Sequence, residues 1–160
     1  MKKNVFLAGV LGSVFLMGSL DCNAANWVKN NFDVPNKNLD SNYYDGDSVK
    51  VHGKTLSWTE KFVLTSFGIT PYNKHLSRYP VCKQNIDKKG NVTHHEIDLE
   101  IKQGKFRTVA KRNYNKNNEL VCTDKDMGAE LDKSWKEIEN KSPMYERYYL
   151  FVTKYKIGDI

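Results

Sequence analysis

Alternation of side-chain character in the segment VTHHEIDLEIK constrains the fold more than any other feature of this sequence. Thr93, His95, Ile97, Leu99 and Ile101 fall on one side of an extended chain, and His94, Glu96, Asp98 and Glu100 fall on the other. A period of two residues is typical of an antiparallel strand with one buried and one solvated face. The segments KFRTVAKRNY and ELVCT follow after the short turns QG and NKNN. We therefore predict an antiparallel meander in the middle of the chain.

The flanking segments extend this prediction. PVCKQNI, followed by the turn DKKGN, is expected to be the first strand of the meander, so that ELVCT is the fourth. Further strands are expected around residues 27–28, from Tyr43, and over SVKV and TLSWTEKFVL. TSFGITPYNKHLSRYP contains two prolines and is predicted to be a long connection.

The pattern changes to a helical period after Cys122. Leu131, Trp135 and Ile138 are spaced i, i+4, i+7, which predicts a helix from about Gly128. Ser142 as N-cap and Pro143 at the first position predict another helix, although YYLFVTKY also has high strand propensity. We expect an α+β fold, a curled antiparallel β-sheet (meander) packed against one or two C-terminal helices. Its core is expected to include Trp58, Leu131, Trp135 and Ile138.

The first 24 residues have the composition of a secretory signal peptide: a basic start, a short apolar run and a small-residue exit. The run is too short for a transmembrane helix, which needs about 20 apolar residues. Asp21 stands before Cys22 and disfavours a lipid anchor on that cysteine. The exit CNA predicts cleavage between Ala24 and Ala25. Residues 25–160 are then expected to form one exported domain without a transmembrane segment.

Cys82 and Cys122 remain after this cleavage, and two cysteines in an exported protein favour a disulfide. They lie in the first and fourth predicted strands of the meander, which a flat sheet would hold roughly 14 Å apart. A disulfide tolerates Cα separations only up to about 6.8 Å. We predict that the bond forms. The sheet must then curl, or one cysteine must lie in a segment that folds back over it.

The net charge of +6 comes mainly from lysines spread along the chain. A dispersed charge of this kind is typical of a solvated surface. It could also attract an acidic partner such as a glycan. The sequence contains no run of five or more basic residues, so we expect no nucleic-acid partner.

His94 and Glu96 are the sharpest candidates for chemistry, because they share one face of the predicted strand. With a third ligand they could hold a metal, and with Arg107 and Arg112 they could form the acid–base set of a secreted nuclease. Such a pair is more often part of a solvated strand face, and no metal, phosphate-binding or nucleophile motif is present. We therefore predict no catalytic residue, no metal site and no cofactor. The aromatic residues, among them Trp27, Trp58 and Trp135, are either core or an exposed binding patch.

Several short motifs resemble the bacterial surface-adhesin protein E family. These are NWVKN, NYYDGDSVKV, Trp58 in the next strand, Cys82 after a loop, and SWKEIENKSPMYE. Asp45 and Ser48 fall in the family's turn, and Trp135 and Ile138 fall in its late motif. The resemblance implies an antiparallel sheet packed on a C-terminal helix. It also implies a role at the bacterial surface, where some members bind host components.

Together these features predict an exported bacterial binding protein, adhesin-like and non-catalytic, at the cell surface, in the periplasm or secreted. Its expected partner is a protein or an acidic glycan of the bacterial surface or of a host. The alternatives are a secreted hydrolase or nuclease that uses His94 and Glu96, and a periplasmic inhibitor of a host enzyme. An exposed aromatic and lysine patch without a cleft would favour binding, whereas a concave pocket gathering His, Glu and Arg would favour catalysis.

Overall fold

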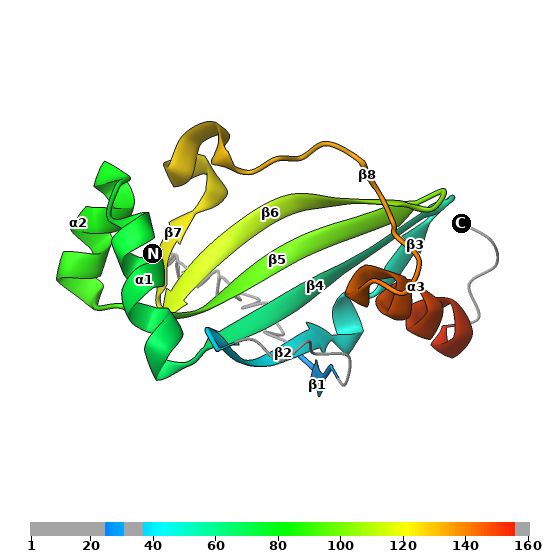
Figure 1. Cartoon of the computed structure of the whole chain (residues 1–160), viewed down its shortest axis with the longest axis horizontal. Helices are drawn as coiled ribbons and strands as arrows, with labels where there is room; N and C mark the ends of the chain where they lie inside the picture. The colour runs from blue at the N-terminus through cyan, green and yellow to red at the C-terminus, as the bar shows by residue number, and fades with distance from the viewer. Residues whose placement is uncertain (1–24, 31–36, 156–160) are drawn as a thin grey trace, which may run out of the picture.

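The computed structural model describes residues 25–30 and 37–155 (Figure 1). In this part of the chain eight strands form one open antiparallel sheet, which is accompanied by three α-helices. The predicted α+β class is thus confirmed. The predicted signal peptide, residues 1–24, lies outside the described residues.

The elements follow one another along the chain with short connections. The strands are β1 (Trp27–Lys29), β2 (Leu39–Asp45), β3 (Lys50–His52), β4 (Thr55–Leu64), β5 (Val92–Lys102), β6 (Lys105–Asn115), β7 (Leu120–Thr123) and β8 (Lys136–Glu137). The α-helices are α1 (Ser66–Leu76), α2 (Pro80–Lys89) and α3 (Pro143–Lys154). Two short 3₁₀ segments, η1 (Gly46–Ser48) and η2 (Asp124–Glu130), follow β2 and β7.

Strands β4, β5 and β6 form the centre of the sheet, whose order is β1-β2-β4-β5-β6-β7. The register pairs Trp58 with Leu99 and Phe62 with His95. Strands β2 and β3 both pair with β4, and β7 and β8 both pair with β6. The QG turn between β5 and β6 is confirmed: Gln103 and Gly104 have φ angles of 51° and 70°, as tight hairpin turns require.

Two segments that were predicted as a loop and a strand are helices. In α1 the Thr65 side chain accepts a hydrogen bond from the Gly68 N–H (3.0 Å). The Asn73 side chain exchanges two bonds with the backbone of Val92 in β5 (2.9 and 2.8 Å). This long-range amide bridge, together with the cap, favours a helix despite Pro71. The strand prediction for PVCKQNI was wrong because Pro80 at a first helical position and Gly90 after the last one are helix boundary signals.

The helices lie at opposite ends of one face of the sheet, which we call the helix face (Figure 1). At one end, α1 places Tyr72 on His95 with ring centroids 5.2 Å apart. At the other end, α3 places Phe151 5.1 Å from the ring of Trp58. Because His95 pairs with Phe62, four residues after Trp58 on the same strand face, both contacts lie on one side of the sheet. The C-terminal helix predicted from Ser142 is confirmed, and the Ser142 hydroxyl caps it.

The helix predicted from Gly128 is absent, and Leu131, Trp135 and Ile138 do not form the apolar stripe expected of it. Gly128 has a φ of +70° and forms a kink inside η2, and after η2 ends at Glu130 the chain has no helix or strand up to β8. The Ser134 N–H donates to the Asp132 side chain (2.9 Å), a local bond that competes with helix formation. Leu131 is half-buried and Ile138 packs at the edge of a core cluster, but Trp135 is 37% exposed. Of the four predicted core residues, only Trp58, 2% exposed, is fully buried.

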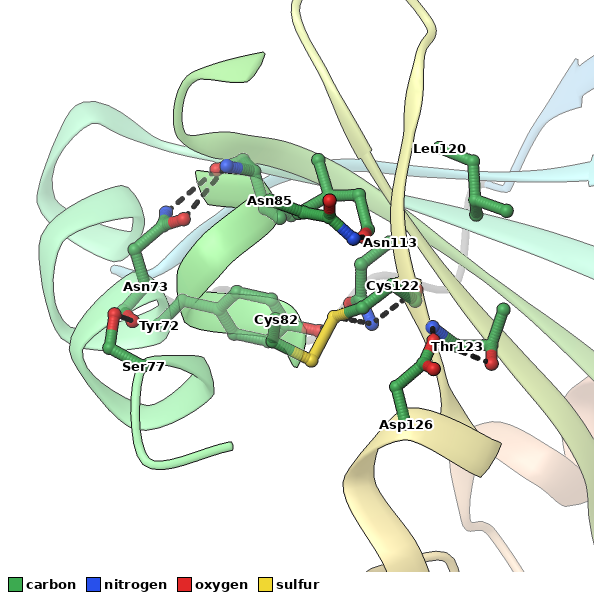
Figure 2. Close-up of a disulfide and its surroundings, with 12 residues drawn as sticks. Tyr72, Asn73, Ser77, Cys82, Asn85, Asn113, Leu120, Cys122, Thr123 and Asp126 are labelled. Atoms are coloured by element: carbon green, nitrogen blue, oxygen red, sulfur yellow. Dashed lines mark hydrogen bonds between the residues drawn. A yellow bond between two sulfur atoms is a disulfide. The ribbon is translucent and has the colours of Figure 1, made fainter. Parts of the chain in front are cut away.

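Cys82 and Cys122 form the predicted disulfide, with a Cα–Cα distance of 5.3 Å (Figure 2). Cys82 belongs to α2 and not to a strand, and the bond joins this helix to β7. The second of the two predicted solutions is therefore correct: one cysteine lies in a segment that folds back over the sheet.

Candidate functional site

The face of the sheet opposite the helices, here called the open face, gathers the titratable residues that the sequence indicated. The β5–β6 register pairs His94 with Tyr114, Glu96 with Arg112 and Glu100 with Arg107. Each of these side chains is half-buried. The period-2 alternation of β5 places His94 and Glu96 on this surface, and the β5–β6 register, with its irregularity between Asp98 and Leu99, brings Arg107 and Arg112 to the same surface.

Arg112 is the centre of the open face. Its two terminal nitrogens bind the two carboxylate oxygens of Asp98 at 2.6 Å each, and its Nε lies 3.4 Å from Glu96. The Thr59 hydroxyl donates a further bond to Asp98 (2.8 Å). Although burial alone would raise it, the pKa of Asp98 is lowered by the hydrogen bonds from Arg112 and Thr59. The hydrogen bonds to Asp98 raise the pKa of Arg112, so both groups are charged over the physiological range.

A second cation, Arg107, connects the sheet to the segment before β8. Its Nε and Nη2 atoms both lie 2.7 Å from the Glu100 carboxylate, and its guanidinium lies 4.6 Å from the centre of the Trp135 ring. Cation–π contacts of this kind contribute about 0.5–1 kcal/mol at exposed sites. Trp135, which was expected in the core, is therefore an exposed aromatic residue beside a charged strand.

Lys61 occupies the opposite side of the open face. Its Nζ lies 4.1 Å from the centre of the Trp27 ring and 5.4 Å from that of Tyr43. Partial burial under these rings lowers the pKa of Lys61, and the nearby Glu96 acts against this shift. Lys61, Arg107 and Arg112 thus each already have an aromatic or carboxylate partner.

His94 is not the solvated side chain that the sequence suggested. Its ring is stacked on Tyr114, with centroids 5.3 Å apart and planes at 9°. Burial, and secondarily the charge of Lys61, lowers the pKa of His94. His94 is therefore neutral at pH 7 and could in principle accept a proton. Within the described residues, however, no group of three or more His, Cys, Asp or Glu side chains could hold a metal ion.

The turn that matches the adhesin motif has a structural role. The Asp45 carboxylate accepts bonds from the backbone N–H groups of Asn26 and Asp47 (3.0 and 3.1 Å). The Ser48 hydroxyl donates to the Asp45 carbonyl (2.7 Å) and accepts from the Thr59 N–H (2.8 Å). These bonds tie β1, β2 and β4 together, and so hold Trp27 beside Lys61.

Sequence reasoning missed two members of this surface, Lys61 and Tyr114. Each stands next to a predicted residue only through cross-strand pairing, so the strand register was the missing information. It also missed the buried groups of the helix face, where Glu60 and Arg147 form an ion pair at 2.5 Å. Glu60 lies on the buried face of β4, and the periodicity of that strand does not indicate that Arg147 is its partner.

Comparison with protein-family models, with curated proteins and with solved structures finds no match to this chain. The resemblance to the surface-adhesin protein E family thus stays a prediction. Among the helices of the described ranges, none has the length and apolar character that crossing a membrane requires.

Proposed function

We propose that this protein is an exported bacterial binding protein, and that the open face of its sheet is the surface that binds another protein. The observation that carries the proposal is the composition of this surface, with its partly exposed Trp, Tyr and Arg side chains: Trp27 and Tyr43 lie around Lys61, and Trp135 lies against Arg107. These three residue types are enriched at the energetic centres of protein–protein interfaces.

The charge of the open face favours a protein over an acidic glycan as the partner. Lys61, Arg107 and Arg112 are balanced by Glu96, Asp98 and Glu100, and the cations are held in place by their neighbours. An acidic polysaccharide would need unpaired positive charge, which these three cations do not supply. A protein surface can use preformed ion pairs and flat aromatic area, because the paired side chains lose little rotamer freedom on binding.

The disulfide supports export, since such bonds persist mainly in oxidising compartments. Intact-mass measurement of the protein from its native host tests this part of the proposal. A mature chain that begins at Ala25 is expected. A diacylglycerol increment on Cys22 would instead place the protein on a membrane, and a full-length chain would contradict export.

Binding is tested with immobilised protein on extracts of its own cell envelope and of host cells, followed by measurement of Kd with the purified partner. Trp27→Ala and Trp135→Ala should each weaken binding about tenfold or more, the loss that 1.4 kcal/mol produces. Tyr149→Ala is the matched control, because Tyr149 is an exposed aromatic residue (63%) on α3, on the other face. Equal affinity of all three variants would rule out the open face as the binding surface.

The hydrolase alternative has a test of its own. His94→Ala should leave any measured nuclease or hydrolase activity of the preparation unchanged, since His94 is stacked on Tyr114 and Arg112 is locked on Asp98. If His94→Ala abolished such an activity at an unchanged melting temperature, the non-catalytic proposal would be wrong.

A further inference from the structure

A pocket of about 420 Å³ lies on the helix face, away from the proposed binding surface. It is bounded by β6, by the segment around β8 and by the first two turns of α3. Its volume falls in the range of small-molecule sites, which is about 300–1,000 Å³. Phe106, Pro143 and Met144 supply apolar walls, and Arg147 is the innermost charged group.

Arg147 is only 7% exposed, so its charge must be compensated where it stands. Glu60 provides part of that compensation: its Oε1 lies 2.5 Å from the Arg147 Nε. This contact is made at the Nε edge of the guanidinium. The Glu60 carboxylate also receives bonds from Trp58 (3.0 Å) and Asn42 (3.3 Å). A guanidinium carries five N–H donors, so the contact at Nε leaves its terminal amino groups as further donors.

The position of Arg147 indicates which of its N–H groups face the pocket. Its Nε edge is beside Glu60, whereas the residue also lines the pocket. We infer that the terminal amino groups are the part of the side chain that reaches the pocket. A guanidinium binds a carboxylate with two parallel hydrogen bonds, and more tightly than a neutral acceptor.

The first turn of α3 adds a second attraction for a negative charge. Ser142 caps the N–H of Tyr145, and Pro143 has none to cap. Met144 lines the pocket. Its backbone N–H belongs to the first turn of α3 and therefore has no hydrogen-bond partner within the helix. The positive end of the helix dipole lies at the same place.

Other charged lining residues limit the charge that a ligand can carry. Glu137 and Glu139 also line the pocket, together with Lys136. Glu137 is paired with Lys105 at 3.0 Å and Lys136 with Asp132 at 3.1 Å, so the charges of these two lining residues are matched by neighbours. The remaining lining carboxylate, Glu139, disfavours a dianion such as a phosphate monoester more than a single carboxylate placed at Arg147. We propose that this pocket binds an apolar monocarboxylate, with its carboxylate at Arg147 and its hydrocarbon part against Phe106, Pro143 and Met144.

The test uses the intact purified protein and three probes of equal chain length: octanoate, 1-octanol and octylammonium. Titration followed by ¹⁵N NMR should show saturable one-to-one binding of octanoate, with shifts at the Arg147 Nε–H and the Met144 N–H. Octanol should bind at least about tenfold more weakly, because it lacks the charge. A separate titration with N-acetyl-leucine represents the carboxyl end of a peptide. Comparison of its affinity with that of octanoate distinguishes a peptide terminus from a free fatty acid as the natural ligand.

Met144→Trp should fill the pocket and abolish octanoate binding, and Tyr149→Trp adds similar bulk to the exposed side of α3 as the matched control. Equal affinity for octanol and octanoate would overturn the role of Arg147. The site itself would be overturned if octanoate showed no saturable binding with a Kd of about 1 mM or lower, or if the shifts were confined to other parts of the chain. Because the probe series needs no variant, this outcome does not depend on whether Met144→Trp folds.

Discussion

The two ends of the sheet are closed by different kinds of interaction. At one end, α2 is joined to β7 by a covalent bond, Cys82–Cys122, which lies within an apolar cluster that also includes Leu76 of α1 (Figure 2). At the other end, α3 is held without covalent bonds, by Phe151 against Tyr44 and Trp58 and by the Arg147–Glu60 ion pair. Every stabilising contact of α3 therefore requires native geometry.

The difference has an energetic consequence. A disulfide stabilises mainly by restricting the unfolded chain, so it tolerates changes in nearby packing. A buried ion pair stabilises only while both charges are present, since a single buried charge is costly. We therefore expect the α3 end to be more sensitive to single substitutions, and the disulfide end to reducing agents.

The largest effect is expected for Arg147→Ala. It leaves Glu60, 1% exposed, without its cation, and should lower the free energy of unfolding by about 3–5 kcal/mol. Urea denaturation measures this loss. The double variant Glu60→Gln/Arg147→Met removes both charges and should recover most of it. If the double variant were as unstable as the single one, packing and not charge would hold α3.

The disulfide end should lose somewhat less when its bond is removed. The bond spans 40 residues of sequence, and Cys82→Ala/Cys122→Ala should cost about 2–4 kcal/mol. Denaturation of the oxidised protein, the reduced protein and the double variant measures this cost. The reduced protein and the double variant should agree, because both lack the loop constraint. A reduced protein as stable as the oxidised one would contradict the contrast between the two ends.

Acid should act on the disulfide end through His95. This ring lies between Phe62 and Tyr72, its Nδ1 has no hydrogen-bond partner, and burial together with Lys111 and His94 lowers its pKa to about 3. Below the unfolded value of about 6.5 the unfolded chain binds a proton that the folded one does not, so stability falls as the pH decreases. The loss attributable to His95 should reach about 2 kcal/mol at pH 5.

The measurement is the difference in pH dependence between the wild type and His95→Phe, which keeps an aromatic ring but cannot titrate. The variant should have a shallower decline between pH 6.5 and pH 5. Parallel pH profiles would show that His95 is protonated in the folded protein or that its site opens readily.

The smallest effect is expected for Trp135→Ala. Because Trp135 is exposed and its best contact is with Arg107, the loss of stability should stay below about 1 kcal/mol. Trp58→Ala is the matched comparison and should cost about 3–5 kcal/mol, since Trp58 is fully buried beside Phe151. Similar losses for the two tryptophans would place Trp135 in the core after all.

The sequence predicted the features that depend on neighbours along the chain. The alternation in β5, the turn at Gln103–Gly104 and the Ser142–Pro143 helix start are all present in the structure. The failed predictions concern segments whose partners are distant. Helix α1 is bridged to β5 through Asn73, and within the segment predicted as a helix Lys136 and Glu137 pair with β6 instead. For α2 the boundary residues Pro80 and Gly90 were informative but were outweighed by an apparent strand pattern.

The sequence by itself thus determined the antiparallel sheet, the C-terminal helix and a bonded cysteine pair, because periodicity, capping and cysteine number act locally or by count. Only the tertiary structure decided that His94, Glu96, Arg107 and Arg112 share a surface with Lys61 and Trp27. Strand register and the side of the sheet on which helices pack bring these residues together, and both arise from contacts between distant parts of the chain. The same reason applies to the Glu60–Arg147 pair, whose partners are far apart in sequence and meet only when α3 lies on the sheet.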